Sequence, residues 1–150
     1  MADWIVPVFD RTQDDVIYAI SKIAEWKENN ITNTSRLKGC LNDTDINRIE
    51  NNIQYISDRL SSLYYFTKIE AKTWDMSQLP DITDVNRIIG NLNNIISSYF
   101  KPNNSPDVPT TMLTYEQINH IEQNLSLLKE MIDNMVNSFR ECGTFNCGEG

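Results

Sequence analysis

The chain is poor in the residues that most active sites and membrane segments require. It has one histidine, His120, and five glycines, none at the spacing of a phosphate-binding or dinucleotide-binding loop. No apolar run approaches the roughly 20 residues that a membrane-spanning helix needs. The first residues lack the basic and long apolar regions of a secretory signal. We therefore expect a soluble protein, made in a cytoplasm, with no membrane partner.

Basic residues are also few, because 13 Lys and Arg stand against 21 Asp and Glu, which gives a net charge of -8. This balance disfavours approach to phosphate backbones and to anionic lipid, so no direct binding of nucleic acid is expected. The acids are spread along the chain without a block of like charge. They indicate a solvated surface or, alternatively, an acidic decoy that occupies a basic nucleic-acid groove.

Cysteine is limited to Cys40, Cys142 and Cys147, which cannot all pair within one chain. Cys142 and Cys147 are spaced more widely than in a zinc knuckle, and His120 and Cys40 are the only further metal ligands of that kind. We expect mostly free thiols, no metal and no cofactor. A contact between Cys40 and the tail is possible if the last helix runs antiparallel to the second. His120 has no cysteine or serine close by in sequence, so no catalytic set and no enzyme are expected.

One pattern occurs three times: "NDTDINRIENNIQYI" at 42–56, "DITDVNRIIGNLNNI" at 81–95 and "TYEQINHIEQNLSLL" at 114–128. Each copy begins with a residue that can accept a hydrogen bond from the free N–H groups of a first helical turn. These predicted N-caps are Asn42, Asp81 and Thr114, and Thr12 begins a looser fourth copy. Asp or Gln three residues after each cap completes a capping box. Leu41 and Leu113, just before their caps, are expected to pack on the first helical turn as hydrophobic staples.

An apolar stripe at helical spacing continues through each copy, and loops rich in Asn, Pro or Ser lie between them. The chain is predicted to be a single all-α domain, an antiparallel bundle of about four capped helices, because short loops favour antiparallel neighbours. The predicted segments are an N-terminal arm at 1–11, helices at 12–28, 42–68, 81–100 and 114–140, and a Cys- and Gly-containing tail at 141–150.

Asparagine recurs at two fixed places in the pattern, although it is a mediocre helix former. It follows the first apolar position at 47, 86 and 119, and it returns five residues later at 52, 91 and 124. We expect these side-chain amides to bond the preceding loop or a neighbouring helix. A ligand-binding surface is the alternative interpretation.

Aromatic residues are the candidates for contact with other molecules. Leu63 to Phe66 are four consecutive large side chains, so one helical stripe cannot bury them all. The candidate interaction residues are Trp4, Tyr64, Tyr65, Phe66 and Trp74. Through them we expect the chain to bind another protein or itself as a homo-oligomer.

The repeated pattern resembles small helical modules of tail-associated structural proteins of phages and prophages of Gram-positive bacteria. In that pattern a Trp precedes a short loop and a cap, followed by Asp-[Ile/Val]-Asn-Arg-Ile-Glu and a later Asn-[Ile/Leu]. Two copies carry it, as Trp74, Asp84-Val85-Asn86-Arg87-Ile88 and Asn91, and as 45–50 with 52–53. The departures are Ile89 in place of Glu, and Gln117 and His120 in place of Asp and Arg.

The resemblance implies a virion protein, tail-associated and synthesised in a host bacterial cytoplasm, that binds other virion proteins. Two functions therefore stand at this point. The first is a non-enzymatic structural module of a phage tail or baseplate. The second is a small acidic, phage-encoded inhibitor of a host nucleic-acid-processing defence enzyme.

Overall fold

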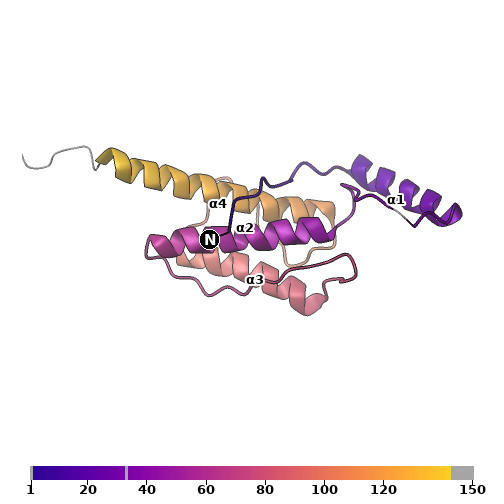
Figure 1. Ribbon diagram of the computed structural model, residues 1–150. Coiled ribbons are helices and arrows are strands. Elements are labelled where there is room, and N and C mark those ends of the chain that lie inside the picture. Colours follow the sequence, from indigo (N-terminus) through magenta and orange to yellow (C-terminus); the bar gives the residue numbers. More distant parts are fainter. Residues whose placement is uncertain (1, 33, 143–150) are drawn as a thin grey trace, which may run out of the picture.

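The computed structural model describes residues 2–32 and 34–142, with side chains as far as Arg140. The regular secondary structure of those residues consists of helices alone. Its helices are α1 (Gln13–Glu28), α2 (Asp43–Ser62), α3 (Ile82–Ser98) and α4 (Tyr115–Cys142), shown in Figure 1. The all-α class is thus confirmed. The Cys147 part of the predicted 141–150 tail lies outside the described residues.

The helices begin at capping boxes. Thr12 Oγ1 accepts from Asp15 N at 3.3 Å, and the Asp15 carboxylate accepts from Thr12 N at 2.8 Å. Asp81 and Asp84 bond in the same reciprocal way, at 2.9 and 3.4 Å. Thr114 and Gln117 do so at 3.3 and 3.1 Å, so Thr114 caps α4. Each box satisfies N–H groups that a first turn leaves free.

Asn42 caps α2 differently. Its side-chain amide donates to the backbone oxygens of Leu37 and Cys40, at 2.9 and 3.0 Å, and so braces the preceding loop. The Asp45 carboxylate still accepts from Asn42 N, at 3.1 Å. The side chain of Asn42 therefore joins the helix to its loop more than it caps the first turn.

The core lies between α2, α3 and α4, which present their apolar stripes to one another. Ile49, Ile53, Ile88, Leu92 and Leu125 are fully buried there. Burying a side chain of this size contributes about 1.5–3 kcal/mol each, which is the main favourable term that holds the bundle.

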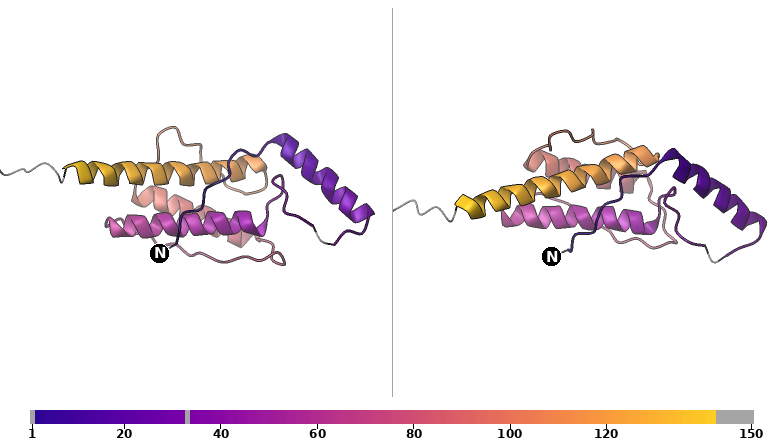
Figure 2. Two further views of the ribbon diagram at one scale, coloured as in Figure 1. Left: turned by 45° about the horizontal axis from the view of Figure 1, so that its top comes forward. Right: turned by 90° about the horizontal axis from the view of Figure 1, so that it is seen from above.

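The three core helices run in the same direction, so the predicted antiparallel arrangement is wrong. Contacts join their beginnings, where Arg48 of α2 meets Glu122 of α4 at 2.6 Å. Others join their ends, where Tyr99 Oη donates to Met135 Sδ at 3.4 Å. An antiparallel pair would bring the beginning of one helix to the end of the other. Figures 1 and 2 show the same course, with α3 and α4 each reached by a chain segment that returns along the bundle.

Three extended segments, here called straps, make this course possible. The first strap is residues 2–11, the second is 63–81 and the third is 99–114. α2 has 20 residues and is therefore about 30 Å long. An extended chain covers about 3.3 Å per residue, so the second strap is long enough to return to the beginning of the bundle.

The predicted helix over 42–68 extends too far, because α2 ends at Ser62. Tyr64 has a φ of 67°, which turns the chain out of the helix. From residue 63 to 70 the side chains alternate between half-buried and exposed positions. This two-residue period is the signature of extended backbone and places Tyr65 and Ile69 against the core. The other predicted boundaries lie within two residues of the observed ones.

Asparagine side chains fasten the straps to the helices. Asn52 accepts from Ile5 N at 3.0 Å and donates to Ile5 O at 2.7 Å, as a peptide group of a neighbouring strand would. Asn47 holds Trp74 in this way, Asn91 holds Glu70 and Asn119 holds Arg11. The expected bonding of these amides to loops is confirmed at these four positions and at Asn124, which donates to Pro106 O. It is wrong for Asn86, which is exposed and whose side chain makes no hydrogen bond among the described residues.

α1 stands apart from this body. Its inner stripe of Val16, Ala19, Ile23 and Trp26 faces the chain segment 31–41, and of these Ala19 is buried. Gly39 lies so close to α1 that a Cβ there would overlap the backbone of Asp15 and Val16. We call α1 together with residues 31–32 and 34–41 the arm, whereas residues 2–11 of the predicted N-terminal arm keep the name first strap. Figures 1 and 2 show it projecting from the end of the bundle where α2, α3 and α4 begin.

Candidate interaction surfaces

A buried ionic cluster joins the first strap to α2 and α4. Arg11 Nη2 lies 2.9 Å from Asp45 Oδ1 and 3.1 Å from Glu122 Oε1. Arg48 Nη2 lies 2.6 Å from both carboxylates, and Val8 N donates to Glu122 at 2.6 Å. Because two guanidinium groups meet two carboxylates, the buried charges balance within the cluster.

The protonation of this cluster is fixed by its geometry. Burial by itself raises the pKa of Asp45, but hydrogen bonds from Arg48 and from Asn42 N, with the charge of Arg11, outweigh it and hold this pKa below its ordinary value of 3.8. Burial likewise lowers the pKa of Arg48, and the bonds and charges of Glu122 and Asp45 reverse that effect and raise it. Asp45 and Arg48 therefore keep their charges through the neutral range and fasten the strap.

A second ionic cluster joins the second strap to α2 and α3. Glu50 accepts from Trp74 Nε1 at 3.2 Å and from Arg87 Nη1 at 3.0 Å, and its side chain is almost fully buried. The hydrogen bond to Glu50 raises the pKa of Arg87. Lys72 pairs with Asp84 beside it, and this bond lowers the pKa of Asp84.

The two clusters follow one rule, in which the Arg of one helix pairs with the Glu of the neighbouring helix on one side of it, taken in the same sense around the bundle. Arg48 pairs with Glu122, and Arg87 pairs with Glu50. The same rule would pair position 120 of α4 with position 89 of α3, where the chain has His and Ile. His120 is exposed and Ile89 is buried. The departures at the Arg and Glu positions of the repeated pattern therefore both fall in the one groove, between α3 and α4, that lacks an ionic cluster among the described residues.

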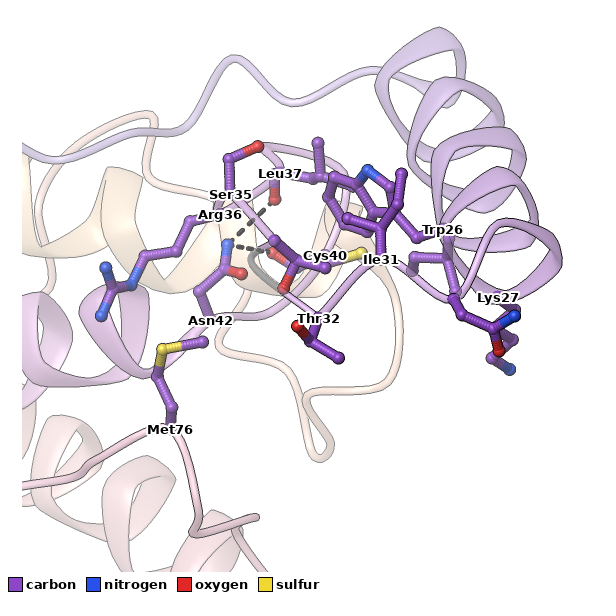
Figure 3. A pocket seen from close by; sticks show the side chains of 13 residues that line it. Trp26, Lys27, Ile31, Thr32, Ser35, Arg36, Leu37, Cys40, Asn42 and Met76 are labelled. Atoms are coloured by element: carbon purple, nitrogen blue, oxygen red, sulfur yellow. Dashed lines mark hydrogen bonds between the residues drawn. The ribbon is translucent and has the colours of Figure 1, made fainter.

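A hollow of about 630 Å³ lies mostly within the arm, between α1 and the segment that follows it, and reaches Asn42 and Met76 of the body. Figure 3 shows Trp26 and Lys27 of α1 on one side of it and Met76 of the second strap on the other, with Cys40 and Asn42 between them. Burial, with the negative charge of Asp45, raises the pKa of the Cys40 thiol. A protonated thiol is a poor nucleophile, so Cys40 contributes apolar surface here.

A second hollow, of about 410 Å³, opens at the end of the bundle where the core helices begin. Its floor includes Ile46, Val85 and Met112, which belong to the core or pack against it. Exposed apolar side chains surround it, and we call them the aliphatic base: Leu41, Met76, Leu79, Ile82 and Leu113. Leu79 is 88% exposed and Leu113 is 87% exposed. The expected staple by Leu113 is therefore wrong, and Leu41, 36% exposed, packs only in part.

The opposite end of the bundle is aromatic. Tyr64, Phe66, Phe100 and Phe139 are exposed there, and we call them the aromatic end. Tyr65 and Tyr99 bring the three helix ends together, since their ring centroids lie 5.0 Å apart and Tyr99 bonds Met135 of α4.

The predicted interaction residues fall into two groups. Tyr64 and Phe66 are 86% and 73% exposed, which leaves both free to contact a partner. Trp74 is buried against Glu50, Tyr65 packs on Tyr99, and Trp4 packs on Tyr55, so these three serve the packing of the chain itself.

The outer side of α1 is a third exposed apolar surface. Ile17, Ile20 and Ala24 are exposed and follow the spacing i, i+3 and i+7, and we call them the outer stripe. Tyr18 lies beside them and is 56% exposed. Sequence reasoning missed this stripe because α1 has two apolar stripes and only the inner one was counted.

Other kinds of site have little support in the described part of the chain. No three His, Cys, Asp or Glu side chains in residues 2–32 and 34–140 are placed to share a metal ion. Among the helices of the described residues, none is both long and apolar enough to cross a membrane. Cys40 lies at the beginning of the bundle and Cys142 ends α4 at the other end, so parallel packing removes the basis for the expected contact between them.

Comparison with known protein families found no match, and comparisons with curated proteins and with solved structures found none either.

Proposed function

We propose that this protein is a non-enzymatic interaction module of a phage or prophage tail or baseplate, and that the outer stripe of α1 binds another virion protein. The observation that carries the proposal is the exposure of that stripe. Ile17 is 56% exposed and Ile20 is 64% exposed, on a helix that packs mainly against its own loop and makes only a minor contact with the core helices. Apolar surface held away from the body in this way is typical of a docking element.

The spacing of the outer stripe fits a helical partner. Side chains at i, i+3 and i+7 form the narrow seam that one helix presents to another in a coiled coil. A partner that offers an apolar groove between two helices would bury Ile17 and Ile20 together. Gly39 supports this role, since the close approach of segment 31–41 fixes the direction in which α1 points.

The distribution of the carboxylates favours this function over an acidic decoy. A decoy must offer free carboxylates to a basic groove. Among the described residues, Asp45, Glu50, Asp84 and Glu122 are buried in ion pairs. Asp15, Asp43 and Asp133 are also paired. Much of the negative charge therefore stabilises the chain itself.

Two measurements test the proposal. Mass spectrometry of particles released by the bacterium that carries the gene should detect the chain as a component. Captured particle proteins should bind the wild type and the Ser21→Asp variant but not Ile20→Asp, which places the same charge within the outer stripe. Binding through apolar side chains should survive moderate salt.

The opposite result has a distinct form. If particles never contain the chain, while a low-salt pull-down recovers a host nuclease that is lost at high salt, the inhibitor function replaces this one.

A further inference from the structure

The two ends of the bundle are complementary in shape. The aliphatic base surrounds a hollow, whereas the aromatic end protrudes because α4 continues beyond Tyr99 and carries Phe139, which is 66% exposed. Large aromatic side chains that enter apolar hollows are the usual anchors of protein interfaces. Met76 and Asn42 line both hollows near the base, so the two hollows adjoin and form one continuous concave surface beside the arm.

The ends are also complementary in charge. Asp75, Asp81 and Glu116 are exposed around the base and form no ion pair within the described residues. Lys68 and Arg140 are exposed beside Phe66 and Phe139 at the aromatic end, and they form none there either. Because α2, α3 and α4 are parallel, their dipoles add, with the positive pole at the base and the negative pole at the aromatic end.

A second copy of the chain could place its protruding aromatic side chains and basic residues against the hollow and acidic residues of the base. We propose that the aliphatic base of one copy receives the aromatic end of the next, with Phe139 as the central anchor, so that the chain assembles head to tail. This inference rests on the proposed function as an assembly module and names a second copy as a partner. The contact joins two different surfaces, so each copy keeps one end open, and growth continues into a ring or a filament.

The test is sedimentation velocity of the full chain over a range of concentrations. The wild type should grow beyond a dimer. Leu113→Asp, in the base, and Phe139→Asp, in the aromatic end, should each weaken association about 30-fold or more, as loss of an interface anchor does. Ser138→Asp is the matched control for charge, because Ser138 is an exposed neighbour of Phe139. Both positions are exposed, so circular dichroism should show unchanged helix content.

Mixing the two variants gives the decisive result. Leu113→Asp keeps an intact aromatic end and Phe139→Asp keeps an intact base, so an equimolar mixture should form a dimer and nothing larger. A monomeric wild type at the highest concentration overturns the proposal, and so does self-association of either variant alone over the same concentration range as the wild type. Particle binding through the outer stripe of α1 is measured separately with Ile20→Asp, so failure of head-to-tail assembly leaves the proposed function standing.

Discussion

At the scale of single residues, the asparagine side-chain amides of this chain take the place of peptide groups as hydrogen-bond partners. Asn47, Asn52, Asn91 and Asn119 each offer one acceptor and one donor to a strap residue, which satisfies backbone groups that would otherwise be left unpaired. Asn124 makes half of this arrangement, because it donates to Pro106 O at 3.0 Å while its own oxygen has no partner. Proline has no N–H to give.

Replacing Asn52 with alanine should destabilise the chain by about 2–4 kcal/mol, because it removes two hydrogen bonds and leaves the peptide groups of Ile5 unpaired beside the bundle. Urea unfolding measures this change. Asn86→Ala is the control, since Asn86 is also an asparagine of the repeated pattern, at the place of Asn47 and Asn119, but is exposed, and it should change stability by less than about 0.5 kcal/mol. Equal effects of the two substitutions would contradict the role assigned to Asn52.

Pro106→Ala supplies an N–H where the oxygen of Asn124 lacks a donor. The new hydrogen bond should contribute about 1 kcal/mol, which offsets the roughly 0.4–1 kcal/mol lost because the unfolded chain becomes more flexible. The gain depends on Asn124. In an Asn124→Ala background the same proline substitution should therefore be less favourable by about 1 kcal/mol, and a double-mutant cycle with no coupling would refute the explanation.

At the scale of elements, the straps decide the topology, and the sequence revealed them only in part. The capped starts at Thr12, Asp81 and Thr114 could be predicted because one residue and its partner three positions later suffice to form a box. The end of α2 could not, since the run from Leu63 to Phe66 is apolar at every position and hides its two-residue alternation. Adding those residues to the helix shortened the predicted loop, and a short loop then implied an antiparallel neighbour.

The surfaces were predictable to a smaller extent. Tyr64 and Phe66 could be singled out because four consecutive large side chains exceed what one stripe buries. The aliphatic base could not be found, because its members come from three separate loops and the start of α3 and meet only when the helices are parallel. Trp74 has the composition of an anchor, yet its indole N–H finds Glu50 inside the fold, and no local pattern distinguishes those two uses.

The groove between α3 and α4 offers a test of the pairing rule. Ile89→Glu combined with His120→Arg places an acid and a base where the other two grooves have them. Each single change should destabilise, Ile89→Glu more strongly because it buries an unpaired charge. The double variant should recover about 0.5–3 kcal/mol relative to the sum of the single changes, as measured by urea unfolding. Additive effects would show that the groove cannot form the pair.

At the scale of the whole molecule, the buried acids make stability depend on pH. The folded-state pKa of Asp45 lies below its ordinary value of 3.8, whereas the unfolded chain has the ordinary value. The unfolded state therefore binds more protons as the pH falls, and the contribution of Asp45 is full at neutral pH and is lost below about pH 5, progressively through the folded pKa.

Asp45→Asn should lower stability at neutral pH and flatten its decline in acid. Denaturant midpoints at several values between about pH 7 and pH 2 measure both changes. Glu130→Gln, on the exposed side of α4, serves as the control and should run parallel to the wild type. A parallel curve for Asp45→Asn would contradict the assignment of acid sensitivity to the cluster.

The parallel course of the helices sets an order in which the chain is completed. The backbone N–H of Ile5 bonds to Asn52, 47 residues later, and that of Arg11 bonds to Asn119, 108 residues later. Contacts between residues so far apart in sequence form slowly, because the intervening chain must first be ordered. The first strap leaves the ribosome before α2 and α4, yet its groove is complete only after α4 has been made. It therefore packs in place only at that point, and its apolar side chains remain uncovered until then.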